Sequence, residues 1–560
     1  MKDREEYLRW LENPALDAAS RAELEAIRDN EEEIRSRFGA MLSFGTAGLR
    51  GVMGAGTNRM NLYTVRQATA GLAEYLLSCG NGAETRGVAV AYDSRRMSLE
   101  FSRTVCRVLA AYGIRSYLFD ELRPTPELSF AVRDLHAAAG VNITASHNPK
   151  QYNGYKVYGE DGAQIGPEQA DAVSARIRAT DLFGVRECSD AEAASWITVL
   201  NRDYDERYMA AVLSQVQDAD VIRRMSGLRV VYTPFHGAGL RLVPEILKRA
   251  GFSNVYPVAE QMIPDGNFPT VESPNPENKE GFALGMKLAD AVRADLLVGT
   301  DPDCDRMGVV VRLPEGGFTA LTGNQVGVIL LDYIIRTRKR LGRMPGDGCA
   351  VKTIVSTEMA ARVCEKNGVT MYNVLTGFKF IGEKMEMFKR EGGTFLLGFE
   401  ESYGYLVGDY ARDKDGAVAA LLVCEAAAYY ASRGMTLYDA MQALYREYGF
   451  HTETTSNFRV EGADASEKMK ERMERLRKDP PKDVAGFRVV EVRDYLCGID
   501  GLPPSDVLYD VLEDRSVVVV RPSGTEPKIK LYVMTAGETE EDSRMKNERI
   551  REAFRPLISQ

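Results

Sequence analysis

The sequence predicts an α/β protein of four domains, three of them α/β with mixed or parallel sheets and a C-terminal one of the α+β class. A chain of 560 residues is too long for one ordinary hydrophobic core. A short apolar run, a Gly- or Asp-rich turn and a helical segment recur in that order, and strands that alternate with helices form parallel sheets covered on both faces. The examples are VAVAYDSRR (88–96), GVNITASHNP (140–149), VVYTPFHGAG (230–239), LLVGTDPDCDR (296–306) and TFLLGFEESYG (394–404).

The two ends of the chain differ from this pattern. The first forty residues are charged, and their apolar residues are spaced as in helices. The apolar segment 417–431, inside the chain, is predicted as a buried helix too short to span a bilayer. In the tail, strands at 516–520 and 529–536 enclose RPSGTEPK, and a charged helix follows them. We predict domains at residues 1–205, 206–320, 321–450 and 451–560.

Composition excludes several classes of function. Hydrophobic residues make up 44% and charged residues 27%, as in soluble globular proteins. The net charge of −10 argues against a broad nucleic-acid surface, although a local cationic cluster could still bind a small anion. The start lacks the apolar stretch of a signal peptide, and the eight cysteines form no CxxC pair. We therefore expect a cytoplasmic protein with reduced thiols and with neither a nucleic-acid nor a membrane partner.

The strongest metal signal lies in DPDCDR, directly after the apolar run LLVG. Asp301, Asp303 and Asp305 alternate in a short loop, where three carboxylates repel one another unless a cation lies among them. Ligands that are all oxygen, with positions left for phosphate or water, favour Mg²⁺. An EF-hand is excluded, because Arg306 stands where its glycine is required and Arg312 where its glutamate is required. An acidic surface turn is the remaining alternative, and the apolar strand that leads directly into the loop argues against it.

The loop TASHNP offers a candidate covalent carrier. Ser146 follows a buried strand and lies beside His147, so its hydroxyl could hold a phosphoryl group. A polar turn stopped by Pro149 is the alternative, and for an isolated Ser-His pair it is the more common case. The chain has only four histidines, and two of them, His147 and His236, fall in loops of this kind. The hexapeptide by itself leaves both interpretations open.

The loop RPSGTEPK predicts a phosphate nest. Gly524 lets neighbouring N–H groups converge, Ser523 and Thr525 add hydroxyl donors, and Arg521 and Lys528 add positive charge. An ordinary loop between two strands is the alternative.

The acidic turn in GFEESYG is a weaker signal. Glu400 and Glu401 follow a buried strand and could accept hydrogen bonds from sugar hydroxyls, with Lys414 as a cation nearby. Acidic turns are common without such a role.

Two glycine-containing segments complete the candidate set. In FGTAGLRG (44–51) and NGYK (153–156) the glycines allow close approach to a ligand. Arg50 could then bind a phosphate with its forked guanidinium, and Lys156 could relay a proton. Glycine turns that carry surface cations are an equally good interpretation.

Taken in order, FGTAGLRG, TASHNP, DPDCDR, FEESYG and RPSGTEPK resemble the signatures of the α-D-phosphohexomutase superfamily, from residue 44 to residue 528. The resemblance implies four domains around a central cleft, the last related to TATA-binding proteins. The EES pair and TGFKFIGEK (376–384) are similar to the phosphoglucomutase branch, and Tyr403-Gly404-Tyr405 replaces the loop ending that carries a histidine in phosphomannomutases. The resemblance also implies a small phosphosugar as partner, Mg²⁺ as cofactor, and the interconversion of glucose 1-phosphate and glucose 6-phosphate through glucose 1,6-bisphosphate.

By the same resemblance, each candidate residue acquires an expected role. Metal ligands would be Ser146, as the phosphoserine, with Asp301, Asp303 and Asp305. Catalytic groups would be Ser146, His147, Lys156, Arg50 and Arg306. Substrate contacts would be Thr46, Glu400, Ser402, Lys414, Arg521, Ser523, Gly524, Thr525 and Lys528. A phosphopentomutase, a phosphomannomutase, a phosphoserine-forming sugar phosphatase and a catalytically silent sugar-phosphate sensor are the alternatives, and the choice between monomer and dimer stays open.

Overall fold

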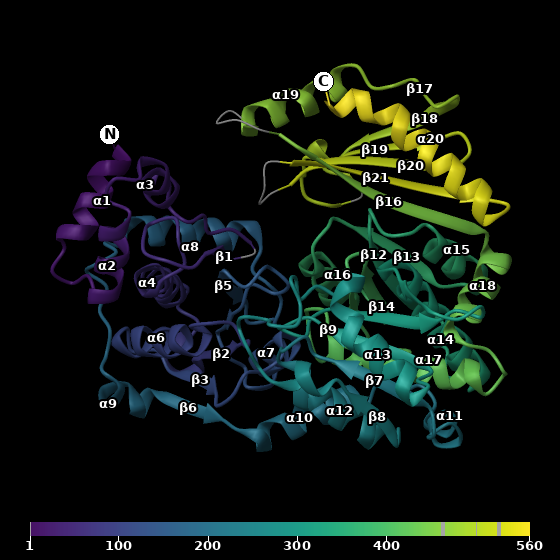
Figure 1. The fold of residues 1–560 in the computed structure, drawn as a ribbon, viewed down its shortest axis with the longest axis horizontal. Coiled ribbons are helices and arrows are strands. Elements are labelled where there is room, and N and C mark those ends of the chain that lie inside the picture. The colour runs from purple at the N-terminus through teal and green to yellow at the C-terminus, as the bar shows by residue number, and fades with distance from the viewer. Residues whose placement is uncertain (1, 47, 461–464, 500, 524–527, 560) are drawn as a thin grey trace.

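The computed structural model describes residues 2–46, 48–460, 465–499, 501–523 and 528–559. In this part of the chain there are four sheets, each built from a continuous stretch of sequence. Figure 1 shows the corresponding four units, with the C-terminal sheet stacked on the third unit and the N-terminal unit to one side. Where one domain ends and the next begins stays a prediction.

The first sheet is mixed, with strand order β1-β5-β4-β2-β3-β6. The strands β4, β2, β3 and β6 run parallel, and β5 and β1 are antiparallel at one edge. Helices α4, α6 and α8 pack on one face, whereas α7 packs on the other. The three helices α1 (Lys2–Glu12), α2 (Ala18–Ala26) and α3 (Glu31–Phe38) precede the sheet. The other elements are β1 (Leu49–Val52), α4 (Leu62–Ser78), α5 (Ala83–Arg86), β2 (Val88–Tyr92), α6 (Ser98–Ala111), β3 (Ser116–Phe119), α7 (Thr125–Asp134), β4 (Ala139–Ile143), β5 (Tyr152–Tyr158), α8 (Pro167–Ala179), α9 (Asp190–Ala193) and β6 (Ile197–Leu200).

The strands of the second and third sheets pair in parallel except at one edge of each sheet, where the pairing is antiparallel. Their strand orders are β11-β10-β9-β7-β8 and β13-β12-β14-β15. The second unit contains α10 (Arg202–Leu213), α11 (Ala219–Arg224), β7 (Arg229–Thr233), α12 (Gly239–Ala250), β8 (Asn254–Pro257), α13 (Ala283–Val292), β9 (Leu296–Thr300), β10 (Met307–Arg312) and β11 (Phe318–Leu321). The third contains α14 (Gly323–Arg340), β12 (Gly348–Thr353), α15 (Met359–Asn367), β13 (Thr370–Val374), α16 (Phe378–Glu391), β14 (Thr394–Glu400), β15 (Gly404–Leu406), α17 (Gly416–Ala431) and α18 (Leu437–Tyr448).

The fourth sheet is antiparallel throughout, with strand order β16-β21-β20-β19-β18-β17. One face packs against α19 and α20, and the other continues the apolar core of the third unit. The elements are β16 (Phe450–Arg459), α19 (Ala465–Lys478), β17 (Asp483–Val484), β18 (Phe487–Asp494), β19 (Leu508–Leu512), β20 (Val517–Pro522), β21 (Lys528–Gly537) and α20 (Glu540–Ser559).

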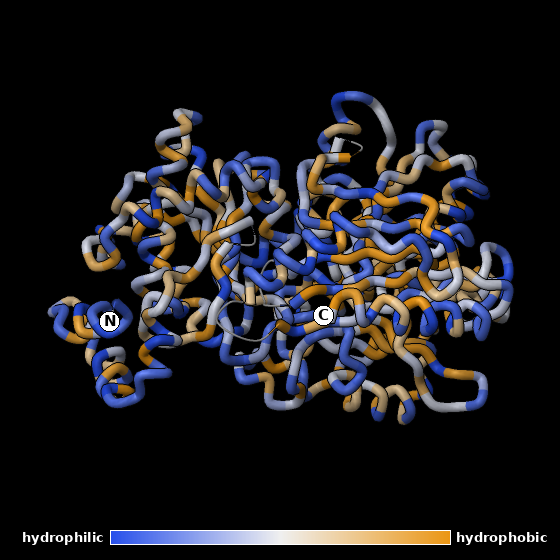
Figure 2. The backbone as a smooth tube through the Cα atoms, turned by 90° about the horizontal axis from the view of Figure 1, so that it is seen from above, coloured by the Kyte–Doolittle hydropathy of each residue, from blue (hydrophilic) through white to orange (hydrophobic). Residues whose placement is uncertain are grey.

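The predicted buried helix is confirmed. Helix α17 covers the apolar segment 417–431, and its residues from Gly416 to Tyr430 are all buried. Figure 2 shows hydrophobic stretches through the interior and hydrophilic stretches around the periphery. Among the described residues, no helix combines the length and the apolar character that crossing a bilayer requires.

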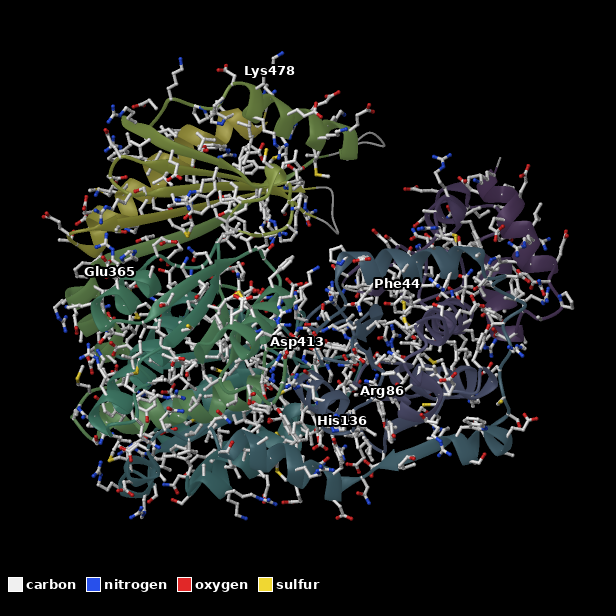
Figure 3. The ribbon with its side chains drawn as sticks, turned by 180° about the vertical axis from the view of Figure 1, so that it is seen from behind. Phe44, Arg86, His136, Glu365, Asp413 and Lys478 are labelled. Atoms are coloured by element: carbon white, nitrogen blue, oxygen red, sulfur yellow. The ribbon has the colours of Figure 1, made fainter. Side chains whose placement is uncertain are left out.

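The topology brings the polar loops together. The loops after β4, β9 and β14 all start at the carboxyl ends of strands in the parallel part of their sheets, where ligands of α/β proteins bind. In Figure 3, Asp413 lies near the middle of the molecule, where the first and third units meet. Its Oδ2 accepts a hydrogen bond of 2.9 Å from the Tyr158 hydroxyl of β5.

Candidate active site

The hydroxyl of Ser146 faces the acidic loop of the second unit. It lies in the turn after β4, is 3% exposed and adopts a left-handed φ of 53°. Its Oγ donates to Oδ2 of Asp301 at 2.8 Å and lies 3.1 Å from Nδ1 of His147. Its backbone N–H donates to the Thr144 hydroxyl at 2.8 Å, which holds the turn in this strained conformation.

Three aspartates form a buried cluster next to this hydroxyl. Asp301, Asp303 and Asp305 each present a carboxylate oxygen, and these oxygens lie within 4.8 Å of one another. Oδ1 of Asp303 and Oδ1 of Asp305 are buried and accept no hydrogen bond from the described residues. Buried carboxylate oxygens without a donor are unfavourable unless a cation neutralises them. The cluster therefore fits a hard divalent cation held by oxygen ligands.

Electrostatics distinguishes the three carboxyls. Burial, followed by repulsion from Asp305 and Asp303, raises the pKa of Asp301 well above its usual range. Burial also opposes ionisation of Asp305, but Lys414, Lys156 and Arg306 outweigh it and hold the pKa of Asp305 well below its usual range. In the metal-free protein the ionised form of Asp301 is therefore unfavourable, and a bound cation would stabilise it.

The surroundings of His147 favour the neutral form of its imidazole. Burial is the largest cause that lowers its pKa well below the usual value, and the positive charges of Arg306 and Arg50 lower it further. A neutral imidazole with Nδ1 close to the Ser146 hydroxyl is able to accept a proton from it.

Arg50 and Lys156 lie on neighbouring antiparallel strands. Arg50 of β1 pairs with Gly154 of β5, and its Nη1 donates to Oδ1 of Asn148 at 2.9 Å. Lys156 of β5 is 3% exposed, and its Nζ lies 2.7 Å from Oδ2 of Asp303. The interpretation of NGYK as a glycine turn is wrong, because these residues lie inside β5. A Cβ atom on Gly154 would lie 2.4 Å from the carbonyl oxygen of Thr144, so the glycine allows two strands to approach.

Gly48 determines how the β1 segment meets β5, which gives a first prediction. Its φ is 72°, and a Cβ atom there would lie 1.8 Å from the carbonyl oxygen of Tyr155. Gly48→Ala is therefore expected to lower the free energy of unfolding by at least about 2 kcal/mol. Urea unfolding followed by circular dichroism measures the loss.

Gly45→Ala is the matched control, because no atom of the described residues beyond its chain neighbours lies within 4 Å of the position that its Cβ would take. This variant should stay within about 1 kcal/mol of the parent chain. Equal stability of the two variants would contradict the steric argument.

Arg306 and Lys414 approach the aspartate cluster from two sides. Nη1 of Arg306 lies 3.3 Å from Oε1 of Glu277, and its Nε lies 3.9 Å from Oδ1 of Asp305. Nζ of Lys414 lies 2.8 Å from Oδ2 of Asp305 and 3.2 Å from Oδ1 of Asp413. Lys414 therefore lies against a predicted metal ligand, although the sequence placed it among the substrate contacts.

The two adjacent glutamates of the third unit have different surroundings. Oε1 of Glu400, at the end of β14, accepts from the Gly377 N–H at 3.0 Å, and burial raises the pKa of Glu400 to about 7. Glu401 instead accepts hydrogen bonds from the hydroxyls of Thr353 and Ser356, at 3.1 and 3.4 Å. Ser402 is half-buried in the turn that follows. Glu400 is therefore the better candidate of the two acids for sugar hydroxyls.

The raised pKa of Glu400 gives a second prediction. Glu400 is a carboxylate above pH 7 and is increasingly protonated below it, so kcat/KM for a sugar phosphate should fall as pH decreases through about 7. Glu400→Gln is expected to lower kcat/KM at pH 8 by about 10- to 100-fold, the worth of a hydrogen bond to a charged group. The variant should also lose this component of the pH profile.

Glu401→Gln serves as the control, because its partners are hydroxyls of its own unit. It should keep the pH dependence. A Glu400→Gln variant with an unchanged pH profile would contradict the assignment.

The predicted phosphate nest lies partly outside the described residues. Gly524 and Thr525 fall in that gap. The backbone N–H of Ser523 donates to the carbonyl of Lys528 at 2.8 Å, and Arg521 Nη1 donates to the Thr376 hydroxyl of the third unit. Thr46 is half-buried in the turn before β1. The described ends of the loop thus connect the fourth unit to the third.

Comparison with known proteins identifies the family. The chain is 37% identical over 519 residues to a phosphoglucomutase of Staphylococcus aureus strain MRSA252, across 90% of this chain and 92% of that protein. Four family models also match: phosphoglucomutase/phosphomannomutase alpha/beta/alpha domains I (41–183), II (206–316) and III (322–448), and the C-terminal domain (457–553). The chain belongs to the phosphoglucomutase/phosphomannomutase family. The resemblance drawn from the sequence is confirmed, and so is the fold class.

Solved structures agree with this membership of the phosphoglucomutase/phosphomannomutase family. A putative phosphomannomutase from Thermus thermophilus superposes with a TM-score of 0.70 at 27% identity, over 93% of this chain and 100% of that chain. The open form of the phosphoglucomutase parafusin from Paramecium has a TM-score of 0.68 at 17% identity, over 92% of this chain and 95% of that chain, which shows a shared fold.

Sequence reasoning missed some residues of this phosphoglucomutase/phosphomannomutase site. Thr125, at the start of α7, donates to Oδ2 of Asp303 at 2.7 Å, and Glu277 pairs with Arg306. Asp93 and Arg95 lie behind the Ser146 turn and contact its neighbours. The sequence singled out only the DSRR turn among these, as an example of the strand-and-polar-turn pattern of the fold and without a functional role.

Proposed function

We propose that this protein is an α-phosphoglucomutase that interconverts glucose 1-phosphate and glucose 6-phosphate through a phosphorylated Ser146. The observation that carries the proposal is the 2.8 Å hydrogen bond between Ser146 Oγ and Asp301 Oδ2, at the edge of the aspartate cluster. A hydroxyl beside a cation site is the arrangement that phosphoryl transfer needs, since positioning and charge neutralisation dominate that reaction. The relatives named phosphoglucomutase support the choice of glucose.

Asp301, Asp303 and Asp305, together with Ser146 once it is phosphorylated, would hold the cation. We infer Mg²⁺ from the all-oxygen donor set. When bound, Mg²⁺ supplies neutralisation of the phosphate charge. Lys156 and Lys414 already balance two of the carboxylates from the protein side.

The transfer begins with attack of a sugar hydroxyl on phosphoserine. The bond between phosphorus and Ser146 Oγ breaks as a bond to the sugar oxygen forms. The proton of the sugar hydroxyl passes to the departing Ser146 Oγ by way of the His147 imidazole, whose Nδ1 lies 3.1 Å from that oxygen, and the product is glucose 1,6-bisphosphate. In the second half the Ser146 hydroxyl attacks the other phosphate of the turned bisphosphate, and the bond between that phosphorus and the sugar oxygen breaks. The serine proton passes through the imidazole of His147 to the departing sugar oxygen, which leaves the sugar monophosphate. Arg50 and Arg306 lie near enough to lower the pKa of His147, so they supply positive charge around the reacting phosphate.

The sugar and its second phosphate need contacts of their own. Glu400 would accept hydrogen bonds from sugar hydroxyls, and Ser402 and Thr46 would add hydroxyl contacts to the substrate. Arg521, Ser523, Gly524, Thr525 and Lys528 would bind the phosphate that is not reacting. We assign Lys414 to the balance of charge around Asp305. We also propose a cytoplasmic location. The eight cysteines all lie in described positions and form no disulfide, as is usual for proteins of a reducing compartment.

A panel of substrates tests the proposed function. The purified protein receives glucose 1-phosphate, mannose 1-phosphate or ribose 1-phosphate, each with Mg²⁺ and a trace of the matching bisphosphate. We expect glucose 1-phosphate to be converted fastest. A preference for ribose or mannose would replace the substrate assignment by a phosphopentomutase or a phosphomannomutase, and stoichiometric release of inorganic phosphate would identify a phosphatase.

A further inference from the structure

The guanidinium of Arg95 is bonded to four backbone carbonyls around the Ser146 turn. The residue lies in the turn after β2 and is 3% exposed. Its Nη2 donates to the carbonyl oxygens of Ser146 and Asn148 at 2.6 and 2.5 Å. Its Nη1 donates to those of Pro149 and Tyr152 at 3.0 and 2.9 Å. One side chain thus connects both ends of the segment between β4 and β5.

A second connection holds the amide side of the same turn. Oδ1 of Asp93 accepts from the Arg95 N–H at 2.9 Å, and Oδ2 accepts from the Thr144 hydroxyl at 2.6 Å. That hydroxyl in turn accepts from the N–H of Ser146. Nε of Arg95 lies 3.2 Å from Asp93 Oδ2, so the two side chains that hold the turn also form a buried ion pair with each other. Both the N–H and the carbonyl of Ser146 are therefore fixed, as its left-handed φ requires.

The segment of the second unit around Phe268 covers this ion pair. The aromatic ring of Phe268 is centred 5.1 Å from Cζ of Arg95, and Phe268 is 2% exposed. A Cβ atom on Gly266 would lie 2.4 Å from the backbone N of Arg96, so the segment around Phe268 is seated closely on the DSRR turn. Covering the guanidinium excludes water and strengthens its interactions with the four carbonyls.

We propose that Arg95 is a positioning residue that fixes Ser146 Oγ against the aspartate cluster, and that Phe268 couples this position to the second unit. The inference rests on the proposed transfer through Ser146. Arg95 acts through the backbone and makes no contact with substrate. Lysine cannot replace it, because an ammonium group has three donors and lacks the planar fork that reaches four carbonyls at once.

Arg95→Lys tests this role, and Arg96→Lys is the matched control. Arg96 is the next residue in the chain and is exposed, so the same substitution there leaves the four carbonyls bonded. For both variants we would measure kcat and KM for glucose 1-phosphate and the rate at which glucose 1,6-bisphosphate phosphorylates Ser146. Melting temperature reports on the fold.

A displacement of about 1 Å at a reacting atom reduces turnover by about 100-fold, so Arg95→Lys should lower kcat and the rate of serine phosphorylation by about that factor. KM for glucose 1-phosphate should stay within about threefold, because the substrate contacts are intact. A variant whose kcat stays within about threefold of Arg96→Lys would overturn the proposal, and so would a lower melting temperature with unchanged kcat. Inactivity of the parent chain and of Arg96→Lys alike would instead refute the proposed function.

Phe268→Leu keeps the assay decisive if Arg95→Lys does not fold. Leucine retains an apolar cover and removes the ring face, so kcat should fall by about threefold, in line with one cation–π contact. Turnover equal to that of the parent chain would then refute the coupling through Phe268 and the positioning role.

Discussion

Ser146→Ala is expected to abolish formation of phosphoserine and to lower kcat by at least about 10³-fold, since alanine has no oxygen to carry the phosphoryl group. The fold should survive the change. The variant loses one hydroxyl, which donates to Asp301 at 2.8 Å, so the loss of stability should be about 1 to 3 kcal/mol. A coupled assay with a trace of glucose 1,6-bisphosphate measures turnover, and intact mass after incubation with the bisphosphate measures the phosphate carried.

Ser253→Ala provides a matched control for this substitution. Ser253 is exposed, and its hydroxyl donates to the carbonyl of Ser226 in a loop of the second unit. This variant should keep both turnover and the bound phosphate. If Ser146→Ala still gained one phosphate per chain, another side chain would be the carrier and the proposed mechanism would have to be abandoned.

Asp301→Asn is expected to remove binding of the divalent cation while leaving the metal-free fold intact. Burial and the neighbouring aspartates make the Asp301 charge unfavourable, so a neutral amide relieves repulsion in the metal-free protein. The amide oxygen can still accept from the N–H groups of Asp305 and Arg306, at 3.1 and 3.0 Å. Loss of one ligand should lower mutase activity by at least about 100-fold.

Melting curves with and without Mg²⁺, after removal of metal by EDTA, separate the two effects. A cation at 100 times its dissociation constant stabilises the parent chain by about 2.7 kcal/mol. The Asp301→Asn variant should gain less than about 1 kcal/mol under the same conditions. Asp290→Asn, which replaces an exposed partner of Arg312, is the control and should respond like the parent. Equal stabilisation of Asp301→Asn and the parent would show that the cation binds elsewhere.

The fold class could be predicted because several of the parallel strands carry a local signal. The apolar runs before Asp93, Thr144 and Asp301 are β2, β4 and β9, and each is followed by the expected polar loop. The antiparallel strand β5 was missed, since the glycine at its centre suggested a turn. Gly154 instead leaves room for the carbonyl oxygen of Thr144, because a Cβ atom there would clash with it. No pattern of neighbouring residues in the sequence reveals this contact.

The candidate site could be predicted in part. Ser146 and the three aspartates lie close together in the structure, although the cluster joins two units. The role of Lys414 was not predictable, because its 2.8 Å contact with Asp305 crosses from the third unit to the second. Arg95 gave no functional signal either, since its partners are backbone carbonyls and any residue type supplies those.

The hydrogen bond between Arg521 and the Thr376 hydroxyl has a consequence for affinity. The guanidinium already has a neutral acceptor from the third unit, so in the proposed role of Arg521 an incoming phosphate would exchange one acceptor for a more basic one. One donor of the guanidinium is thereby bonded to the protein before the anion binds. Release of Thr376 would also remove one hydrogen bond between the fourth unit and the third, so binding of the proposed ligand would be thermodynamically linked to how these two units are held together.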